Sequence, residues 1–227
     1  MSCDLEPASP GRVYRIGRRP DPWAYQEWAD AGDDGTFGNR WDDPESSYRV
    51  LYACSQRLGA FVETLSRFRP DPEVVAGLSE IKGEDEAAPA LPPGHVPRAW
   101  LEGRLMGEAI LQGQYADVGH SRSLSYLRRA LAARVVHHGL GDLDGVAIRL
   151  SAPRRFTQEI SRLIYECTAQ DGRQQFDGIR YISRLGDEFK NWAIFEPGRL
   201  SDQAAGPIRD DDPDLTDAVQ RLGLSLE

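Results

Sequence analysis

Short β-rich segments and amphipathic helical segments alternate along this 227-residue chain, but without the strict strand–helix–strand rhythm of a doubly wound fold. Alternating or wholly apolar β-rich runs predict strands at 12–17, 48–53, 145–150, 178–182 and 191–195. Apolar residues at helical spacing predict helices after Ser55 and at 123–138, 156–165 and 215–222. The pattern therefore predicts an α/β (α+β) fold in which helices flank a mixed central sheet.

The connecting segments divide the chain into one domain and two accessory regions. Residues 23–41 are rich in Gly and Asp without a clean period, which predicts an irregular loop, and residues 96–111 carry apolar blocks typical of one or two strands. The acidic, Pro-containing stretch 70–94 is typical of an inserted, exposed loop. We expect a single domain over 12–197 with this insertion, followed by an acidic C-terminal tail at 198–227.

Charge and cysteine content argue against several classes of protein. The formal net charge of −9 disfavours direct nucleic-acid binding, which needs clustered Lys and Arg, although a few pocket arginines suffice for a nucleotide. No stretch approaches the roughly 20 apolar residues of a membrane span, and no secretory signal is visible, so we expect no membrane partner and a cytoplasmic location. Cys3, Cys54 and Cys167 lie far apart, and a disulfide framework is not expected.

We expect no metal site. His137 and His138 are adjacent, so on a helix their side chains point in different directions, and no Asp or His stands at ligand spacing from them.

The strongest group of chemically active residues lies between Arg15 and Glu63. Arg40 lies in a glycine-bearing loop with the run GNRWDDP, Tyr52 comes near the end of a predicted strand, and Glu63 lies on the flank of the next helix. A carboxylate that borders the core needs a partner, and arginines of the preceding loop are natural candidates. From the residues alone, a structural ion pair and a sheet tyrosine explain the same pattern.

The ordered runs YRIG, GNRW, RVLYACSQRLGAFVET, DGIRYISR and NWAIF resemble the RES domain family over residues 12–195. The resemblance implies an ADP-ribosyltransferase-like fold and an NAD-binding domain, because characterised members consume NAD as toxins of toxin–antitoxin pairs. This chain departs from the usual GGRWN pattern, since Asn39 and Asp42 replace a Gly and an Asn. A side chain at residue 39 would hinder close approach of a ligand to the backbone.

The resemblance also implies roles for individual residues. Arg15 and Arg40 would hold the pyrophosphate, because a guanidinium matches phosphate oxygens. Tyr52 would stack near the nicotinamide or its ribose, and Ser183 would hydrogen-bond that region. Glu63 would be the catalytic carboxylate that stabilises an oxocarbenium-like transition state, with Arg40 and Tyr52 beside it.

The implied function is NAD degradation at the nicotinamide–ribose bond, by phosphorolysis or hydrolysis, in the toxin of a toxin–antitoxin pair. No cofactor is expected beyond NAD as substrate, with phosphate as a co-substrate of phosphorolysis, and the expected partners are a helix-turn-helix antitoxin and a second copy of the chain. Two alternatives stay open: a protein mono-ADP-ribosyltransferase, and a non-catalytic binding module occupied by a partner protein.

Overall fold

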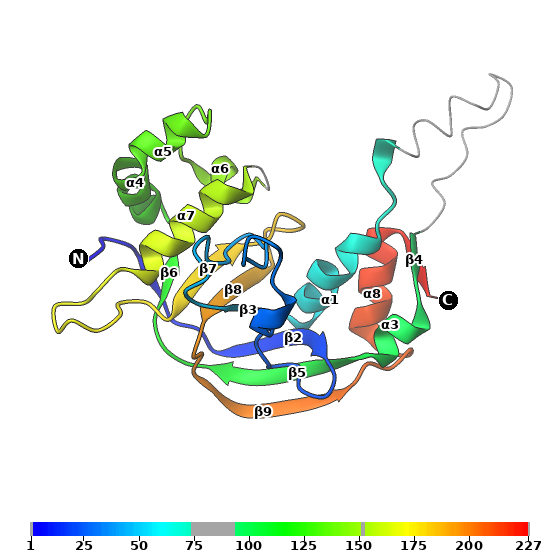
Figure 1. The fold of residues 1–227 in the computed structure, drawn as a ribbon. Coiled ribbons are helices and arrows are strands. Elements are labelled where there is room, and N and C mark those ends of the chain that lie inside the picture. The colour runs from blue at the N-terminus through cyan, green and yellow to red at the C-terminus, as the bar shows by residue number, and fades with distance from the viewer. Residues whose placement is uncertain (1, 74–93, 151–152, 227) are drawn as a thin grey trace, which may run out of the picture.

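The computed structural model describes residues 2–73, 94–150 and 153–226, and these residues fold around a curled eight-stranded sheet (Figure 1). In sheet order, the strands are β1 (Pro7–Ala8), β6 (Tyr115–Asp117), β7 (Gly178–Ile182), β8 (Lys190–Phe195), β3 (Val50–Cys54), β2 (Arg12–Arg18), β5 (Arg104–Leu111) and β9 (Leu200–Pro207). The sheet is mixed, because β6 and β7 run parallel while the other neighbouring strands in it are antiparallel. A mixed α/β fold was predicted and is confirmed.

Helices cover the sheet in two groups (Figure 1). The first group consists of α4 (Ser121–Ala130), α5 (Ala132–His137), α6 (Gly145–Arg149) and α7 (Arg154–Tyr165). The second consists of α1 (Arg57–Leu65), α3 (Arg98–Glu102) and α8 (Pro213–Leu222), beside a small parallel pair of β4 (Gly94–Val96) and β10 (Leu224–Leu226). Each group has its own apolar core, one around Ile160, Ile164 and Ile179 and the other around Phe61, Leu65 and Leu215. The space between the groups opens onto β2, β3 and β8.

Several elements match their predicted positions, and three differ. The strands at β2, β3, β7 and β8 and the helices α1, α7 and α8 are confirmed. Residues 145–150, predicted as a strand, form the short helix α6, because the Asp144 side chain caps it by accepting from the Ala147 N–H at 2.8 Å. The helix predicted at 123–138 divides at Leu131 into α4 and α5, and residues 96–111 include α3 between two strands.

The residues expected to form an acidic tail are part of the fold. Strand β9 pairs with β5 at the edge of the sheet, and α8 packs against α1 within one apolar core. The guanidinium of Arg57, at the start of α1, contacts both Asp212 and Asp214 at the start of α8. The segment after residue 197 is therefore not a tail, because β9 extends the sheet beside β5 and α8 packs on α1. Almost all of the insertion expected at 70–94 lies outside the described residues.

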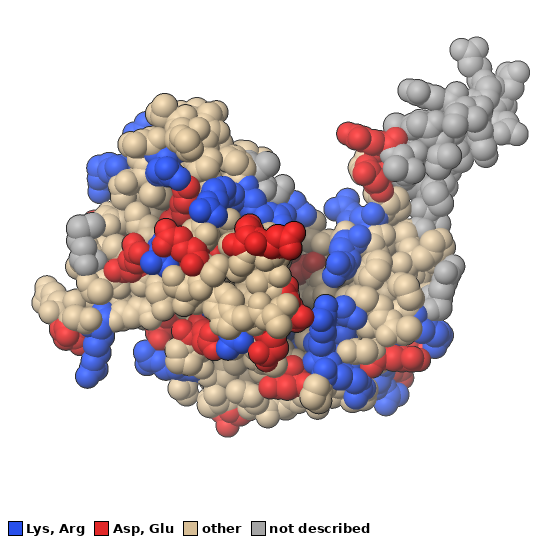
Figure 2. Space-filling model, in the orientation of Figure 1, with Lys and Arg blue, Asp and Glu red and all other residues tan. Residues whose placement is uncertain are grey.

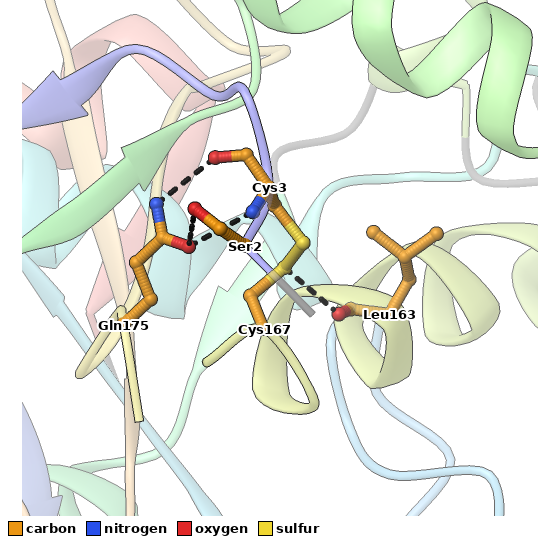
Figure 3. The surroundings of a disulfide bond; sticks show 5 residues. All are labelled: Ser2, Cys3, Leu163, Cys167 and Gln175. Atoms are coloured by element: carbon orange, nitrogen blue, oxygen red, sulfur yellow. Dashed lines mark hydrogen bonds between the residues drawn. A yellow bond between two sulfur atoms is a disulfide. The ribbon is translucent and has the colours of Figure 1, made fainter. Parts of the chain in front are cut away.

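A disulfide joins Cys3 to Cys167, contrary to the expectation from cysteine spacing (Figure 3). The two Cα atoms lie 5.7 Å apart although 164 positions separate them in the sequence. Gln175 supports the same contact, because its side chain accepts from the Cys3 N–H at 2.9 Å and donates to the Cys3 carbonyl at 2.9 Å. The N-terminal segment is thereby fixed to the end of α7. No helix in the described part of the chain is both long and apolar enough to cross a membrane.

Candidate active site

A cavity of about 360 Å³ lies between α1 and the α6–α7 side of the molecule, over β2, β3 and β8. Its volume falls in the range of small-molecule sites. Five arginines line it, namely Arg15, Arg40, Arg149, Arg154 and Arg184, together with one carboxylate, that of Glu63. Figure 2 shows a hollow in this face with basic side chains along both of its sides. The walls therefore carry an excess of positive charge although the whole chain is acidic.

Arg40 is half-buried in the cavity and has no polar partner among the described residues. Its Nε and Nη2 atoms are shielded from solvent without a hydrogen bond, and its guanidinium lies 5.3 Å from the centroid of the Trp41 ring and 5.7 Å from that of Tyr181. Burial lowers the pKa of Arg40, while Tyr181 and Glu63 act in the opposite direction. Nη1 is not among these shielded atoms, so it is the donor of Arg40 that can reach an anion in the cavity.

The backbone on either side of Arg40 is fixed by helix α7 and by neighbouring polar groups. The Gln158 side-chain amide donates to the Asn39 carbonyl at 3.1 Å, and the Ser161 hydroxyl donates to the Trp41 carbonyl at 2.6 Å. Arg154 also donates to the carbonyl of Gly38. Because both neighbours of Arg40 are bonded to the same helix, the backbone that carries this side chain is fixed in place.

Asn39 and Asp42, the two departures from the family pattern, are bonded to each other. The Asp42 carboxylate accepts from the Asn39 backbone N–H at 2.7 Å and from its side-chain amide at 2.8 Å. Its other oxygen accepts from the Tyr52 hydroxyl at 2.8 Å, and that hydroxyl accepts in turn from the Trp41 N–H at 3.0 Å. The two substitutions thus form one network, in which the Asn39 side chain is drawn to Asp42.

This network determines how Tyr52 and Asp42 ionise. Burial raises the pKa of the Tyr52 hydroxyl well above its ordinary value, and the neighbouring Asp42 carboxylate adds to the effect. Burial also raises the pKa of Asp42, against the opposing hydrogen bonds from Tyr52 and Asn39. Tyr52 lines the cavity as a neutral phenol whose hydroxyl is already engaged, so its ring is the part available to a ligand.

Arg15 lines the cavity at the point where β2 and β3 diverge. These two strands pair in register at Tyr14 and Cys54, and beyond that point Arg15 donates from Nη1 to the Tyr52 carbonyl at 2.7 Å. Its Nε donates to the Pro22 carbonyl, also at 2.7 Å. Burial lowers the pKa of Arg15 to about 10. Two of its donors therefore hold the backbone, so Arg15 fixes the frame of the cavity between β2 and β3.

Glu63 reaches the cavity from the second half of α1, half-buried as its place on the helix flank predicts. The ion-pair partner expected for it is absent from the described residues, because the salt bridges there do not involve Glu63. Its Oε1 instead accepts from the side-chain amide of Asn191, on β8, at 2.5 Å. Sequence reasoning missed Asn191, since a single Asn at the start of an apolar strand carries no motif.

Ser183 does not line this cavity. Its side chain is 1% exposed and its hydroxyl accepts from the Leu185 N–H at 2.8 Å, so it shapes the turn between β7 and β8. The adjacent Arg184 does line the cavity and has no hydrogen bond or ion pair with a described residue. Arg18 and Arg19, at the end of β2, are not among the residues that line the cavity.

The curled mixed sheet and the arginine-lined cavity with one carboxylate define an α/β protein with a positively charged pocket. Comparison with protein families matches the RES domain to residues 12–216, and the chain belongs to the RES domain family. The match extends past residue 197 and so includes β9 and the start of α8. A search among curated proteins found no match. Membership of the family is consistent with an NAD-related, toxin-like function and suggests an enzyme that acts on NAD.

Proposed function

We propose that this protein cleaves the nicotinamide–ribose bond of NAD, with phosphate or water as the acceptor. The observation that carries the proposal is the pairing, in one cavity, of an unpartnered Arg40 guanidinium with the Glu63 carboxylate. NAD presents both matching features, an anionic pyrophosphate and a ribose that becomes cationic when the glycosidic bond breaks.

The chemistry assigns a separate task to each group. Arg40 and Arg184 bind the pyrophosphate, and Arg15 holds the frame between β2 and β3 while adding positive charge. Tyr52 packs its ring against the nicotinamide riboside. As the C–N bond breaks, its electron pair leaves with nicotinamide, and the Glu63 carboxylate stabilises the developing oxocarbenium charge. Attack by phosphate gives a phosphorylated ADP-ribose, whereas attack by water gives ADP-ribose and releases a proton.

The toxin setting is part of the same proposal. An enzyme that degrades NAD must be inhibited in the cell that makes it. Arg184 is exposed at the cavity wall, so a partner protein that covers the pocket can contact it. A helix-turn-helix antitoxin is the proposed partner, on the strength of the family resemblance.

The test is incubation of the purified chain with NAD, with and without phosphate, and resolution of nicotinamide and sugar-nucleotide products by mass. We expect nicotinamide release by the parent and a loss of about 100-fold or more in Glu63→Gln, which removes the charge but keeps the shape. A phosphorylated product identifies phosphorolysis, free ADP-ribose identifies hydrolysis, and a mass increase on protein identifies ADP-ribosyl transfer. Intact NAD under both conditions would contradict the proposal.

A further inference from the structure

The side-chain amide of Asn191 is the hydrogen-bond partner of Glu63 in the cavity, and the residue is 2% exposed. We propose that Asn191 is a positioning residue for Glu63, holding one carboxylate oxygen so that the other faces the ligand. The inference rests on the proposed function, since it assigns Asn191 a part in the reaction of Glu63.

The chemistry of the contact fixes the orientation of the amide. A carboxylate can only accept hydrogen bonds, so the Nδ2 group of Asn191 must face Glu63 Oε1, at 2.5 Å, and Oδ1 must point away. That Oδ1 atom is shielded from solvent and has no hydrogen-bond partner among the described residues. A buried acceptor without a partner costs free energy, which an apolar side chain at this position would avoid. Asn191 is present despite this cost, and it supplies a hydrogen-bond donor to Glu63.

The amide is mounted on a rigid part of the sheet. In β8, Asn191 lies in register between Cys54 of β3 and Tyr181 of β7, both of which line the cavity. Its two neighbours bind the segment that leads into α1. The Lys190 N–H donates to the Gln56 side chain at 3.0 Å, and the Trp192 ring N–H donates to the Ser55 hydroxyl at 2.8 Å.

These contacts attach α1 to β8 at two levels. Residues 190 and 192 hold the entry to the helix, and Asn191 holds the carboxylate two turns later. The helix is thus prevented from turning about its axis, and Glu63 Oε2, which has no hydrogen bond with a described residue, is left for the ribose. A carboxylate fixed in this way needs little reorganisation when positive charge develops beside it.

Steady-state kinetics of four proteins test the inference: the parent, Asn191→Leu, Glu63→Gln and the double variant. Leucine keeps the branching of asparagine at Cγ and lacks a donor, although it is larger. We expect Asn191→Leu to lower kcat for nicotinamide release by about 10-fold or more, with KM for NAD changed by less than about 3-fold. In the Glu63→Gln background, Asn191→Leu should change kcat by less than about 3-fold, because the carboxylate through which Asn191 acts has been removed. Equal losses in both backgrounds, or an unchanged kcat in the single variant, would overturn the inference.

A second measurement needs no turnover and is made on the folded parent and Glu63→Gln. The chain has two asparagines, Asn39 and Asn191, so selective ¹⁵N-asparagine labelling gives two side-chain NH₂ signals in the NMR spectrum. Asn39 is bonded to Asp42 and serves as the internal control. We expect Glu63→Gln to move the Asn191 signals and leave those of Asn39 in place.

The two measurements separate failure of the inference from failure of the proposed function. Asn191 signals that do not move in Glu63→Gln would overturn the inference whatever the activity. A parent protein that leaves NAD intact, combined with Asn191 signals that do move, would overturn the proposed function and support the attachment of Glu63 to Asn191.

Discussion

The hydroxyl of Ser161 donates a hydrogen bond to the backbone carbonyl of Trp41 at 2.6 Å, across 120 positions of sequence. The same Ser161 oxygen lies 2.9 Å from the hydroxyl of Tyr48, and all three residues are buried. Helix α7 thus holds the backbone one residue after Arg40, which links the packing of the helical group to the geometry of the cavity.

Ser161→Ala should lower both stability and NAD binding. The change leaves the buried Trp41 carbonyl without its donor, so we expect a loss of about 1–3 kcal/mol in the free energy of unfolding, measured by urea denaturation. Loss of this bond should also make the backbone next to Arg40 more mobile, so we expect weaker NAD binding, measured by titration calorimetry. Ser125→Ala, at an exposed serine of α4, is the matched control and should stay within about 0.5 kcal/mol of the parent. Equal denaturation midpoints for Ser161→Ala and the parent would contradict the expected role.

Arg40→Ala should weaken NAD binding by about 10- to 100-fold, the range of a lost hydrogen bond to a charged group. Arg40→Lys should recover only part of this affinity, because an ammonium lacks the flat fork of the guanidinium. Arg184→Ala should have a smaller effect, since this side chain is exposed at the wall. Titration calorimetry at fixed salt measures each affinity. Arg173→Ala, at an arginine whose side chain is 87% exposed and which does not line the cavity, controls for net charge and should bind as the parent does.

Asp42 should give the protein a pH-dependent stability that Asp42→Asn lacks. Burial raises the pKa of Asp42 above its ordinary value of 3.8, so the protonated form is favoured by folding. The resulting stabilisation is fully present below pH 3.8 and is lost as the pH rises through the raised pKa. The free energy of unfolding of the parent, minus that of Asp42→Asn, should therefore decrease as the pH rises from 3.8 toward neutrality.

Urea denaturation at intervals across that pH range measures the difference. The hydrogen bonds that Asp42→Asn disturbs with Asn39 and Tyr52 add an offset that does not change with pH. A constant difference, or one that grows in favour of the parent as the pH rises, would rule out the buried ionisation.

Thiol counting should distinguish Cys54 from the two other cysteines. Cys54 is buried as a free thiol, and burial raises its pKa to about 12, so it stays protonated near pH 8. We expect no reaction with a thiol reagent in the folded protein and one reactive thiol after unfolding without reductant. Reduction before unfolding should bring the count to three, the full number of cysteines in the chain. Three thiols without reductant would contradict the Cys3–Cys167 bond.

Local sequence signals predicted the elements whose periodicity is strong. Strand β2, helix α1 and helix α7 follow directly from alternating or helical apolar spacing, and these elements bring Arg15 and Glu63 to the cavity. Arg40 and Tyr52, to which the resemblance to RES proteins gives roles, also line the cavity. Whether these residues act on NAD is still a prediction.

Features that depend on long-range contacts were beyond local signals. Strand β9, with the sequence LSDQAAGP, lacks an apolar alternation because it lies at the sheet edge and is mostly exposed. The Cys3–Cys167 bond joins residues too far apart in the sequence for their spacing to predict it. Residues 145–150 have an apolar pattern typical of a strand, but capping by Asp144 starts a helix there. The orientation of Ser183 was likewise beyond local signals, since the segment between β7 and β8 places Arg184 rather than Ser183 at the cavity wall.

The position of β8 in the sheet has a consequence for synthesis of the chain. This strand lies between β7 and β3 in the middle of the sheet, although it is encoded more than 120 residues after Glu63. Ribosomes add residues in order, so helix α1 emerges long before the strand to which its carboxylate is bonded. The contact between Glu63 and Asn191 can therefore form only after residues 190–195 have been added, and a nascent or prematurely terminated chain that lacks them cannot complete this side of the cavity.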